Sequence, residues 1–135
     1  VLQHQHTKAM FEHLDPASPT PLYAQLAERL RAAIAAGDLA PGELLPSVRQ
    51  LAVRLRLNPG TVVQAYRDLE AAGLVELRQG SGTYVRELTP SRRAAEQAAV
   101  SSRLAHEMLA RAVGLGLSGE DLLNALRTAL GEKRR

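Results

Sequence analysis

Residues 46–73 read PSVRQLAVRLRLNPGTVVQAYRDLEAAG, and this stretch decides the fold. Apolar residues at positions 48, 51, 52 and 55 recur at helical spacing, which predicts a short helix that follows Pro46 and runs to about Arg56. Asn58 suits a helix cap and Pro59 a first helical position, so another helix is predicted from Pro59 to about Ala72. Two helices of about ten and fourteen residues, joined by about three, have the spacing of a helix-turn-helix.

The segments on either side extend this unit. Before it, a helix is predicted from Pro21, with Thr20 as its cap, to Gly37, because apolar residues at 22, 26, 30, 33 and 34 form one stripe. After it, the apolar runs 74–78 and 83–86 flank a glycine-bearing turn and predict a β-hairpin. Leucines 44 and 45 are too short a run for more than a minor strand. The sequence therefore predicts a mainly α fold, with a winged helix-turn-helix domain over residues 20–88.

The two ends of the chain are predicted to differ. Residues 1–19 lack periodicity and are expected to be a flexible arm, in which His4 and His6 are better explained as solvated than as metal ligands. Residues 89–135 are expected to form two helices, the second after a capping box at 118–121. Their apolar faces need a partner, either the first domain or a second subunit. We expect dimerisation through Leu104, Met108, Leu109, Leu122, Leu123, Leu126 and Leu130.

Composition excludes several classes of protein. At 135 residues, with 45% apolar and 23% charged residues, the chain matches about one globular domain. It has no cysteine, which excludes a disulfide framework, a thiolate zinc site and a cysteine nucleophile. No apolar run approaches the roughly 18 residues of a membrane span, and the amino end does not read as a signal peptide. We expect a cytoplasmic protein with no membrane partner, metal or cofactor.

The positive charge is concentrated in the middle of the chain. The formal net charge of +3 divides into −2 for residues 1–46, +3 for residues 47–86 and +2 for residues 87–135. All six cations of the middle block are arginines, whose planar guanidinium suits phosphates and guanine edges. A small arginine excess could also serve solubility alone, so the charge gains its meaning from the motif around it.

The helix after the turn of a winged helix-turn-helix enters the major groove, and its amino end reaches base edges. Asn and Gln can pair with adenine there, and glycine lets the backbone approach the DNA. Asn58 is equally explained as a cap, whereas Gln64 lies opposite the apolar face and is the better candidate for a base contact. The residues expected at this end are Asn58, Pro59, Gly60, Thr61 and Gln64.

Further contacts are expected from the preceding helix and from the hairpin. Arg49 lies off the apolar stripe of its helix and should meet the phosphate backbone, and Arg54 and Arg56 flank the turn. Arg54 is explained as well by an ion pair with an acid such as Glu43. The hairpin tip should reach the minor groove or its phosphates with Arg78, Gln79, Gly80 and Ser81, although the turn itself also requires glycine.

These motifs resemble the DNA-binding domain of the GntR family of bacterial transcription regulators, over about half the chain. The resemblance implies a homodimer that reads a palindromic operator in double-stranded DNA, with a DNA contact by Arg49 in the Pro-Ser-x-Arg motif. The matching residues are Pro21-Leu22-Tyr23-x-Gln25-Leu26, Gly37-Asp38-Leu39-x-Pro41-Gly42-x-x-Leu45-Pro46-Ser47-x-Arg49-x-Leu51-Ala52, Asn58-Pro59-x-Thr61-Val62-x-x-Ala65-Tyr66-x-x-Leu69-Glu70-x-x-Gly73-Leu74-Val75 and Gly80-x-Gly82-Thr83-x-Val85.

One departure narrows the resemblance. Many relatives carry Ser-Arg-x-Thr at the turn, where this chain has Asn58-Pro59-Gly60-Thr61, so the arginine contact of those relatives does not transfer. This version, with only about 50 residues after the hairpin, is similar to the YtrA subfamily. That similarity implies a short helical dimerisation unit, and it suggests control of a transporter operon.

Other functions are less well supported. GntR-like domains also occur fused to an aminotransferase-like domain that binds pyridoxal phosphate through a lysine, but the segment after the hairpin is too short and holds only Lys133. His106 has no partnered nucleophile for Ser/His/Asp catalysis, so we expect no enzyme. A non-specific architectural DNA binder should carry a larger basic excess than +3. An unknown small-molecule effector could bind between subunits, but apolar residues at helical spacing are more often dimer core.

Overall fold

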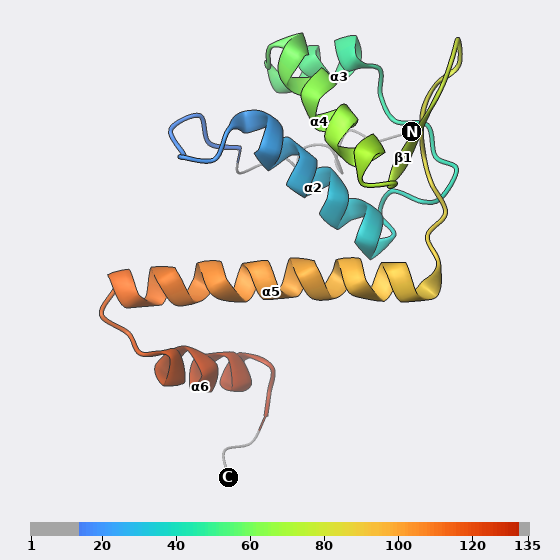
Figure 1. Cartoon of the computed structure of the whole chain (residues 1–135). Coiled ribbons are helices and arrows are strands. Elements are labelled where there is room, and N and C mark those ends of the chain that lie inside the picture. The colour runs from blue at the N-terminus through green and yellow to red at the C-terminus, as the bar shows by residue number, and fades with distance from the viewer. Residues whose placement is uncertain (1–13, 133–135) are drawn as a thin grey trace. The chain divides into compact units, whose positions relative to one another are not determined.

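The computed structural model describes residues 14–132, whose helices and strands are drawn in Figure 1. The chain divides into two compact units between Gln97 and Ala98. The first unit holds helices α2 (Leu22–Ala36), α3 (Val48–Leu55) and α4 (Pro59–Ala71), strands β1 (Val75–Arg78) and β2 (Gly82–Val85), and the first two turns of α5 (Pro90–Gly114). The second unit holds the rest of α5 and α6 (Gly119–Ala129). Three helices followed by a hairpin form the predicted winged helix-turn-helix.

The core of the first unit lies between α2, α4 and the hairpin. Leu26, Leu30 and Ile34 of α2 are fully buried because residues three and four apart share one face of a helix. Val62 and Leu69 are likewise buried on one face of α4, which packs against α2. The remaining buried members are Ala33, Leu39, Leu45, Leu51, Ala52, Ala65, Tyr66, Leu74, Val75 and Val85.

The start of α2 differs from the prediction. Pro21 is extended, with ψ at 148°, and its carbonyl opens the helix, so α2 begins at Leu22. The prediction that Thr20 caps the helix is wrong, because no side chain caps it. The Thr20 carbonyl accepts a 2.7 Å hydrogen bond from Gln25 Nε2, and Gln25 also bonds the backbone N–H and carbonyl of Asp15 at 2.8 Å. Gln25 therefore holds residues 14–20 against α2. The remaining part of the predicted arm, with His4 and His6, lies outside the described residues.

The hairpin is supported by a short segment that runs beside it. Leu44 forms a single antiparallel bridge with Tyr84 of β2, and the N–H groups of residues 42 and 45 donate to β2 carbonyls at 2.8 Å. Gly82 lies against Leu44: a Cβ there would come within 2.6 Å of Leu44 Cδ1, and the φ of 136° also favours glycine. The expected minor strand at Leu44 and Leu45 is thus one bridge that braces the wing.

The second unit exposes most of its apolar side chains. The predicted capping box is confirmed: Ser118 Oγ accepts from the Asp121 N–H and Asp121 Oδ2 from the Ser118 N–H, both at 3.0 Å. These bonds lower the pKa of Asp121. No described residue of α6 is buried, and Ala112 is buried in α5. Of the residues predicted for dimerisation, Met108 and Leu122 are half-buried, whereas five are exposed, namely Leu104, Leu109, Leu123, Leu126 and Leu130.

Candidate nucleic-acid interface

Arg49 lies in the first turn of α3, and that turn is closed by a capping box. Ser47 Oγ accepts from the Gln50 N–H at 3.1 Å, and Gln50 Oε1 accepts from the Ser47 N–H at 3.0 Å. Because Leu51 and Ala52 of the same helix are buried in the core, Arg49 is left on the solvent side and is exposed. The capped first turn of α3 therefore presents an exposed arginine.

The amino end of α4 is organised by Asn58. Its Oδ1 accepts a 2.8 Å hydrogen bond from the Gly60 N–H, and Pro59 occupies the first helical position. The alternative interpretation of Asn58 as a helix cap is thus correct, with its side-chain amide oxygen as the acceptor. Asn58, Pro59 and Gly60 are all exposed, while Thr61 is half-buried. The positive end of the helix dipole also favours a negatively charged partner such as a phosphate at this position.

Gln64 is exposed on α4, one turn further on, and has a defined side-chain partner. Its Nε2 donates to Asp68 Oδ1 at 3.0 Å. This bond turns the amide so that the oxygen and the second N–H of the amide stay available. Adenine offers an N6–H donor beside an N7 acceptor in the major groove, which is the complement of that pair.

Arg67 is a candidate contact that sequence reasoning missed. It is exposed on α4, three residues after Gln64 and therefore on the same side of the helix. The sequence did contain a signal for this contact, because Arg67 lies off the apolar stripe of the helix that is predicted to enter the major groove. We call this helix, α4, the reading helix.

The turn between α3 and α4 holds Arg56 in an unusual backbone conformation. Its φ of 55° and ψ of 44° are left-handed, and within residues 14–132 Arg56 is the one non-glycine residue with a positive φ.

Arg54, at the end of α3, is exposed. Glu43, the acid considered as its alternative partner, accepts a hydrogen bond from the Ala40 N–H through Oε1. Arg49 and Arg56 line the same open groove of about 700 Å³ between α3 and the start of α4. Of the three arginines predicted to contact phosphates, the fold thus brings Arg49 and Arg56 together at this groove, whereas Arg54 does not line it.

The wing tip is arranged around Tyr84. The Arg78 guanidinium lies 4.2 Å from the centroid of the Tyr84 ring, a cation–π contact, and Ser81 Oγ lies 2.6 Å from the Tyr84 hydroxyl. Arg78 also forms a long ion pair with Glu76 at 3.9 Å, and half of its side chain remains exposed. Gln79 and Gly80 are exposed beside it. Tyr84 thereby orients the arginine of the wing, a role that the sequence did not reveal.

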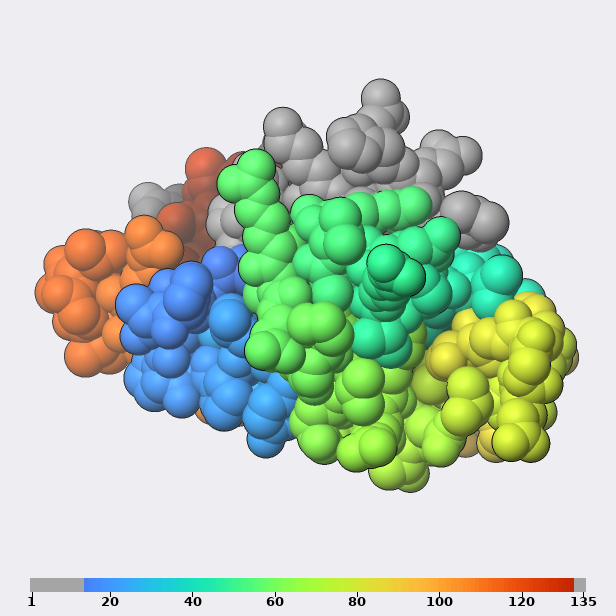
Figure 2. Space-filling model, turned by 90° about the horizontal axis from the view of Figure 1, so that it is seen from above, coloured from blue at the N-terminus to red at the C-terminus, as the bar shows by residue number. Residues whose placement is uncertain are grey.

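These elements lie on one face of the first unit. Figure 2 shows α3, α4 and the hairpin as neighbours on that face. The exposed arginines of these elements and of the turn are Arg49, Arg54, Arg56, Arg67 and Arg78. Neighbouring elements that carry five exposed guanidinium groups attract a phosphate backbone.

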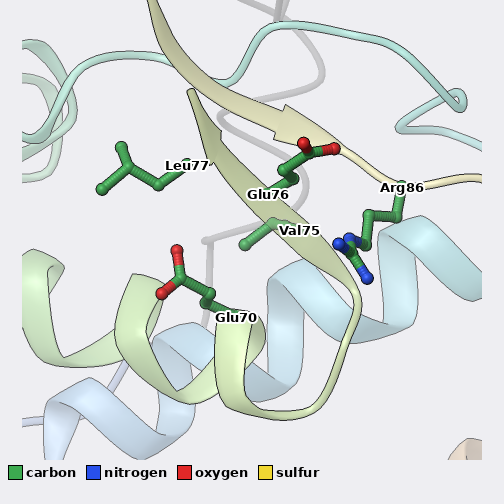
Figure 3. Close-up of a pocket in the computed structure, with 5 residues that line it drawn as sticks. All are labelled: Glu70, Val75, Glu76, Leu77 and Arg86. Atoms are coloured by element: carbon green, nitrogen blue, oxygen red, sulfur yellow. The ribbon is translucent and has the colours of Figure 1, made fainter. Parts of the chain in front are cut away.

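A different surface adjoins the base of the hairpin. Glu70 of α4 and Glu76 of β1 line an open pocket of about 330 Å³ with Val75, Leu77 and Arg86 (Figure 3). Two carboxylates and one guanidinium line it, so this pocket repels phosphate more than it attracts it. We therefore leave it out of the candidate interface.

Two negative findings apply to residues 14–132. No group of three or more His, Asp or Glu side chains in this range is arranged to hold a metal ion. None of the helices in the same range has the length and apolarity needed to cross a membrane.

A winged helix-turn-helix with an arginine-bearing face around its reading helix defines a DNA-binding transcription regulator. The chain belongs to the GntR family: the family described as "Bacterial regulatory proteins, gntR family" matches residues 22–85. This match confirms the resemblance to the GntR family, which is a family of regulators rather than enzymes. The similarity to a YtrA repressor and to the structure of a YtrA factor from Sulfolobus acidocaldarius confirms its YtrA-like character.

Individual relatives extend this likeness beyond the matched domain. The chain is 43% identical to the HTH-type transcriptional repressor YtrA of Bacillus subtilis (strain 168) over 74 residues, which are 55% of this chain and 57% of YtrA. It is 33% identical to the uncharacterized HTH-type transcriptional regulator YhcF of the same organism over 115 residues, 82% of this chain and 91% of YhcF. A GntR family transcriptional regulator from Listeria monocytogenes has a similar structure, with a TM-score of 0.67, 27% identity and coverage of 84% and 97%.

Proposed function

We propose that this protein is a cytoplasmic, sequence-specific repressor that binds an inverted-repeat operator as a homodimer. The observation that carries the proposal is that Arg49, Gln64 and Arg78 are exposed on α3, α4 and β1, three elements that lie side by side on one face of the first unit (Figure 2). In such an arrangement arginines at the edges bind phosphates, while the reading helix between them contacts base edges. The YtrA-like character adds a transporter operon as the suggested target.

Each element of the face has its own role in this proposal. Arg49 and Arg56 neutralise phosphates and fix the register of the protein on the duplex. Gln64 reads one base position, adenine by the geometry of its amide. Arg78, held by Tyr84, enters the minor groove or binds its phosphates.

The exposed apolar side chains of α5 and α6 support the homodimer. Leu104 is 54% exposed and Leu130 is 78% exposed, although both are large and apolar. Several large apolar side chains exposed within one short helical segment favour an interaction site there. A second copy related by a twofold axis would cover it and would present two reading helices to two half-sites.

The operator proposal is tested by selecting bound fragments from genomic DNA and then comparing variants on the selected duplex. Arg49→Ala should weaken binding to all sequences and reduce the salt slope of the affinity by about one unit. The matched control is Arg111→Ala on α5, which should leave both unchanged. The wild-type protein should prefer the selected duplex over unrelated DNA by a factor of about 10³ or more. Unchanged affinity in Arg49→Ala, or the absence of any preferred sequence, would contradict the proposal.

The dimer proposal is tested by sedimentation of the full chain. Leu126→Asp places a charge in the predicted apolar interface and should yield monomers, because an unpaired buried charge is strongly unfavourable. Leu77→Asp, on an exposed leucine of the wing, serves as the control and should leave the oligomeric state unchanged. A monomeric wild-type chain at micromolar concentration, or a dimeric Leu126→Asp variant, would argue against this interface.

A further inference from the structure

Glu96 is a buried carboxylate that the proposed DNA contacts do not use. It lies in the second turn of α5 and is only 5% exposed. Among residues 14–132 it is the one charged residue that is buried. Burial of a carboxylate is costly unless charged partners and hydrogen bonds compensate. The surroundings of Glu96 therefore indicate what its burial achieves.

Two arginines from different helices hold this carboxylate. Arg31 of α2 binds both oxygens, with Nε 2.6 Å from Oε2 and Nη2 2.8 Å from Oε1. Arg92, one turn earlier on α5, donates from Nε to Oε1 at 3.1 Å. The Arg31 bonds, followed by those of Arg92, lower the pKa of Glu96, so it is ionised at neutral pH. A bidentate pair of this kind fixes geometry as well as charge.

The neighbouring side chains of α5 reach the ends of two other helices. Arg92 Nη2 donates to the Ala72 carbonyl at the end of α4, at 2.6 Å. Arg93 Nη1 donates to the Ile34 carbonyl at 2.9 Å, and Gln97 Nε2 to the Ala35 carbonyl at 3.0 Å, both at the end of α2. Terminal helix carbonyls lack partners within their own helix, and cations are favoured beside them. Residues 92–97 thus bind the ends of α2 and α4 together.

We propose that Glu96 is a positioning residue: with Arg31 and Arg92 it locks the first two turns of α5 onto the DNA-binding unit and so sets which half-site spacing the dimer accepts. The inference rests on the proposed homodimer, because α5 leads to the predicted dimerisation segment. A loosely attached reading unit accepts many spacings, whereas a locked one binds both half-sites together only when their separation fits. Buried ionic groups serve best where they specify geometry, since they add little net stability over apolar packing.

The test uses the full-length protein and the genomic duplex selected as described above. Affinity is measured for that duplex, for a single half-site, and for versions with two, four or six base pairs inserted between the half-sites. Glu96→Gln keeps the shape of the side chain but removes its charge, and Arg31→Gln opens the same lock from α2. The matched controls are Glu107→Gln, on an exposed acid of α5, and Arg29→Gln, on an exposed arginine of α2.

Both lock variants should keep the wild-type affinity for a single half-site and remain dimeric, yet lose about tenfold in affinity for the native spacing. Their loss on insertion should be smaller than that of the wild type, whereas the controls should behave like the wild type. An unchanged spacing profile in folded Glu96→Gln or Arg31→Gln overturns the inference, as does an equal loss on single and paired half-sites, which would make Glu96 merely structural. If Glu96→Gln does not fold, Arg31→Gln decides. A wild type that shows no gain from a second half-site overturns the proposed function instead.

Discussion

The hydroxyl of Tyr66 on α4 donates a 2.7 Å hydrogen bond to the backbone carbonyl of Pro46. Tyr66 is 7% exposed, and burial raises the pKa of its phenol, which keeps the hydroxyl protonated as a donor. Pro46 immediately precedes Ser47, the cap of α3. This one bond therefore links the reading helix to the turn that carries Arg49.

Tyr66→Phe removes the donor and leaves the Pro46 carbonyl without its partner, while the ring still fills the core. The free energy of unfolding in urea should fall by about 1–3 kcal/mol, the usual cost of an unpaired buried polar group. Tyr23→Phe changes an exposed tyrosine of α2 and should have little effect. Equal stability of the two variants would mean that the bond does not hold α3 in place.

Arg56 gives a prediction in which stability and binding move in opposite directions. A left-handed backbone costs roughly 1–2 kcal/mol for most residues, but asparagine adopts it readily. Arg56→Asn should therefore raise the free energy of unfolding by up to about 1 kcal/mol and weaken DNA binding by loss of a phosphate contact. Arg54→Asn, on the right-handed backbone of α3, should weaken binding without any gain in stability. A less stable Arg56→Asn would show that the side chain itself stabilises the turn.

The Gln64–Asp68 pair predicts how a base is discriminated. Gln64→Ala should lose about 1–3 kcal/mol of preference at one base pair, measured by competition between duplexes that differ there. Asp68→Asn can donate or accept toward Gln64, so either orientation of the Gln64 amide becomes available. The Asp68→Asn variant should keep its overall DNA affinity but show a weaker preference for adenine over guanine. A preference that Asp68→Asn leaves unchanged would mean that Asp68 does not orient the amide.

Local sequence signals predicted the helix-turn-helix well. Asn58 and Pro59 mark the start of α4 because both residue types have strong positional preferences at a helix amino end. The recurrence of apolar residues every three or four positions likewise identified Leu26 and Leu30 as core residues. Such signals depend on residues within a turn or two of one another, so they can be recognised in a single sequence.

Contacts between distant residues could not be predicted in this way. Glu96 and Arg31 are 65 positions apart, and in the sequence Glu96 resembles any exposed acid of an amphipathic helix. The Thr20 cap was wrong for a local reason: Pro21 is extended and its own carbonyl opens the helix, so Thr20 lies one position before the cap. The support of Arg78 by Tyr84 depends on the strand register, which places the two rows of side chains together only in three dimensions.

The depressed pKa of Glu96 predicts how stability changes with acid. Its ordinary value is 4.5, and in the folded protein the Arg31 and Arg92 bonds hold the pKa lower. As pH falls below about 4.5, the unfolded chain takes up a proton on Glu96 before the folded chain does, which favours unfolding. The stability that the ionised Glu96 contributes is therefore fully present above this pH and is lost as the pH falls through the pKa of Glu96 in the folded protein.

Urea unfolding of wild type and Glu96→Gln from pH 7 to pH 3 gives the free energy of unfolding as a function of pH. The two curves should converge in acid, whereas the curve of Glu107→Gln should run parallel to that of the wild type. A constant difference between wild type and Glu96→Gln at every pH would mean that the carboxylate is not stabilised in its ionised form.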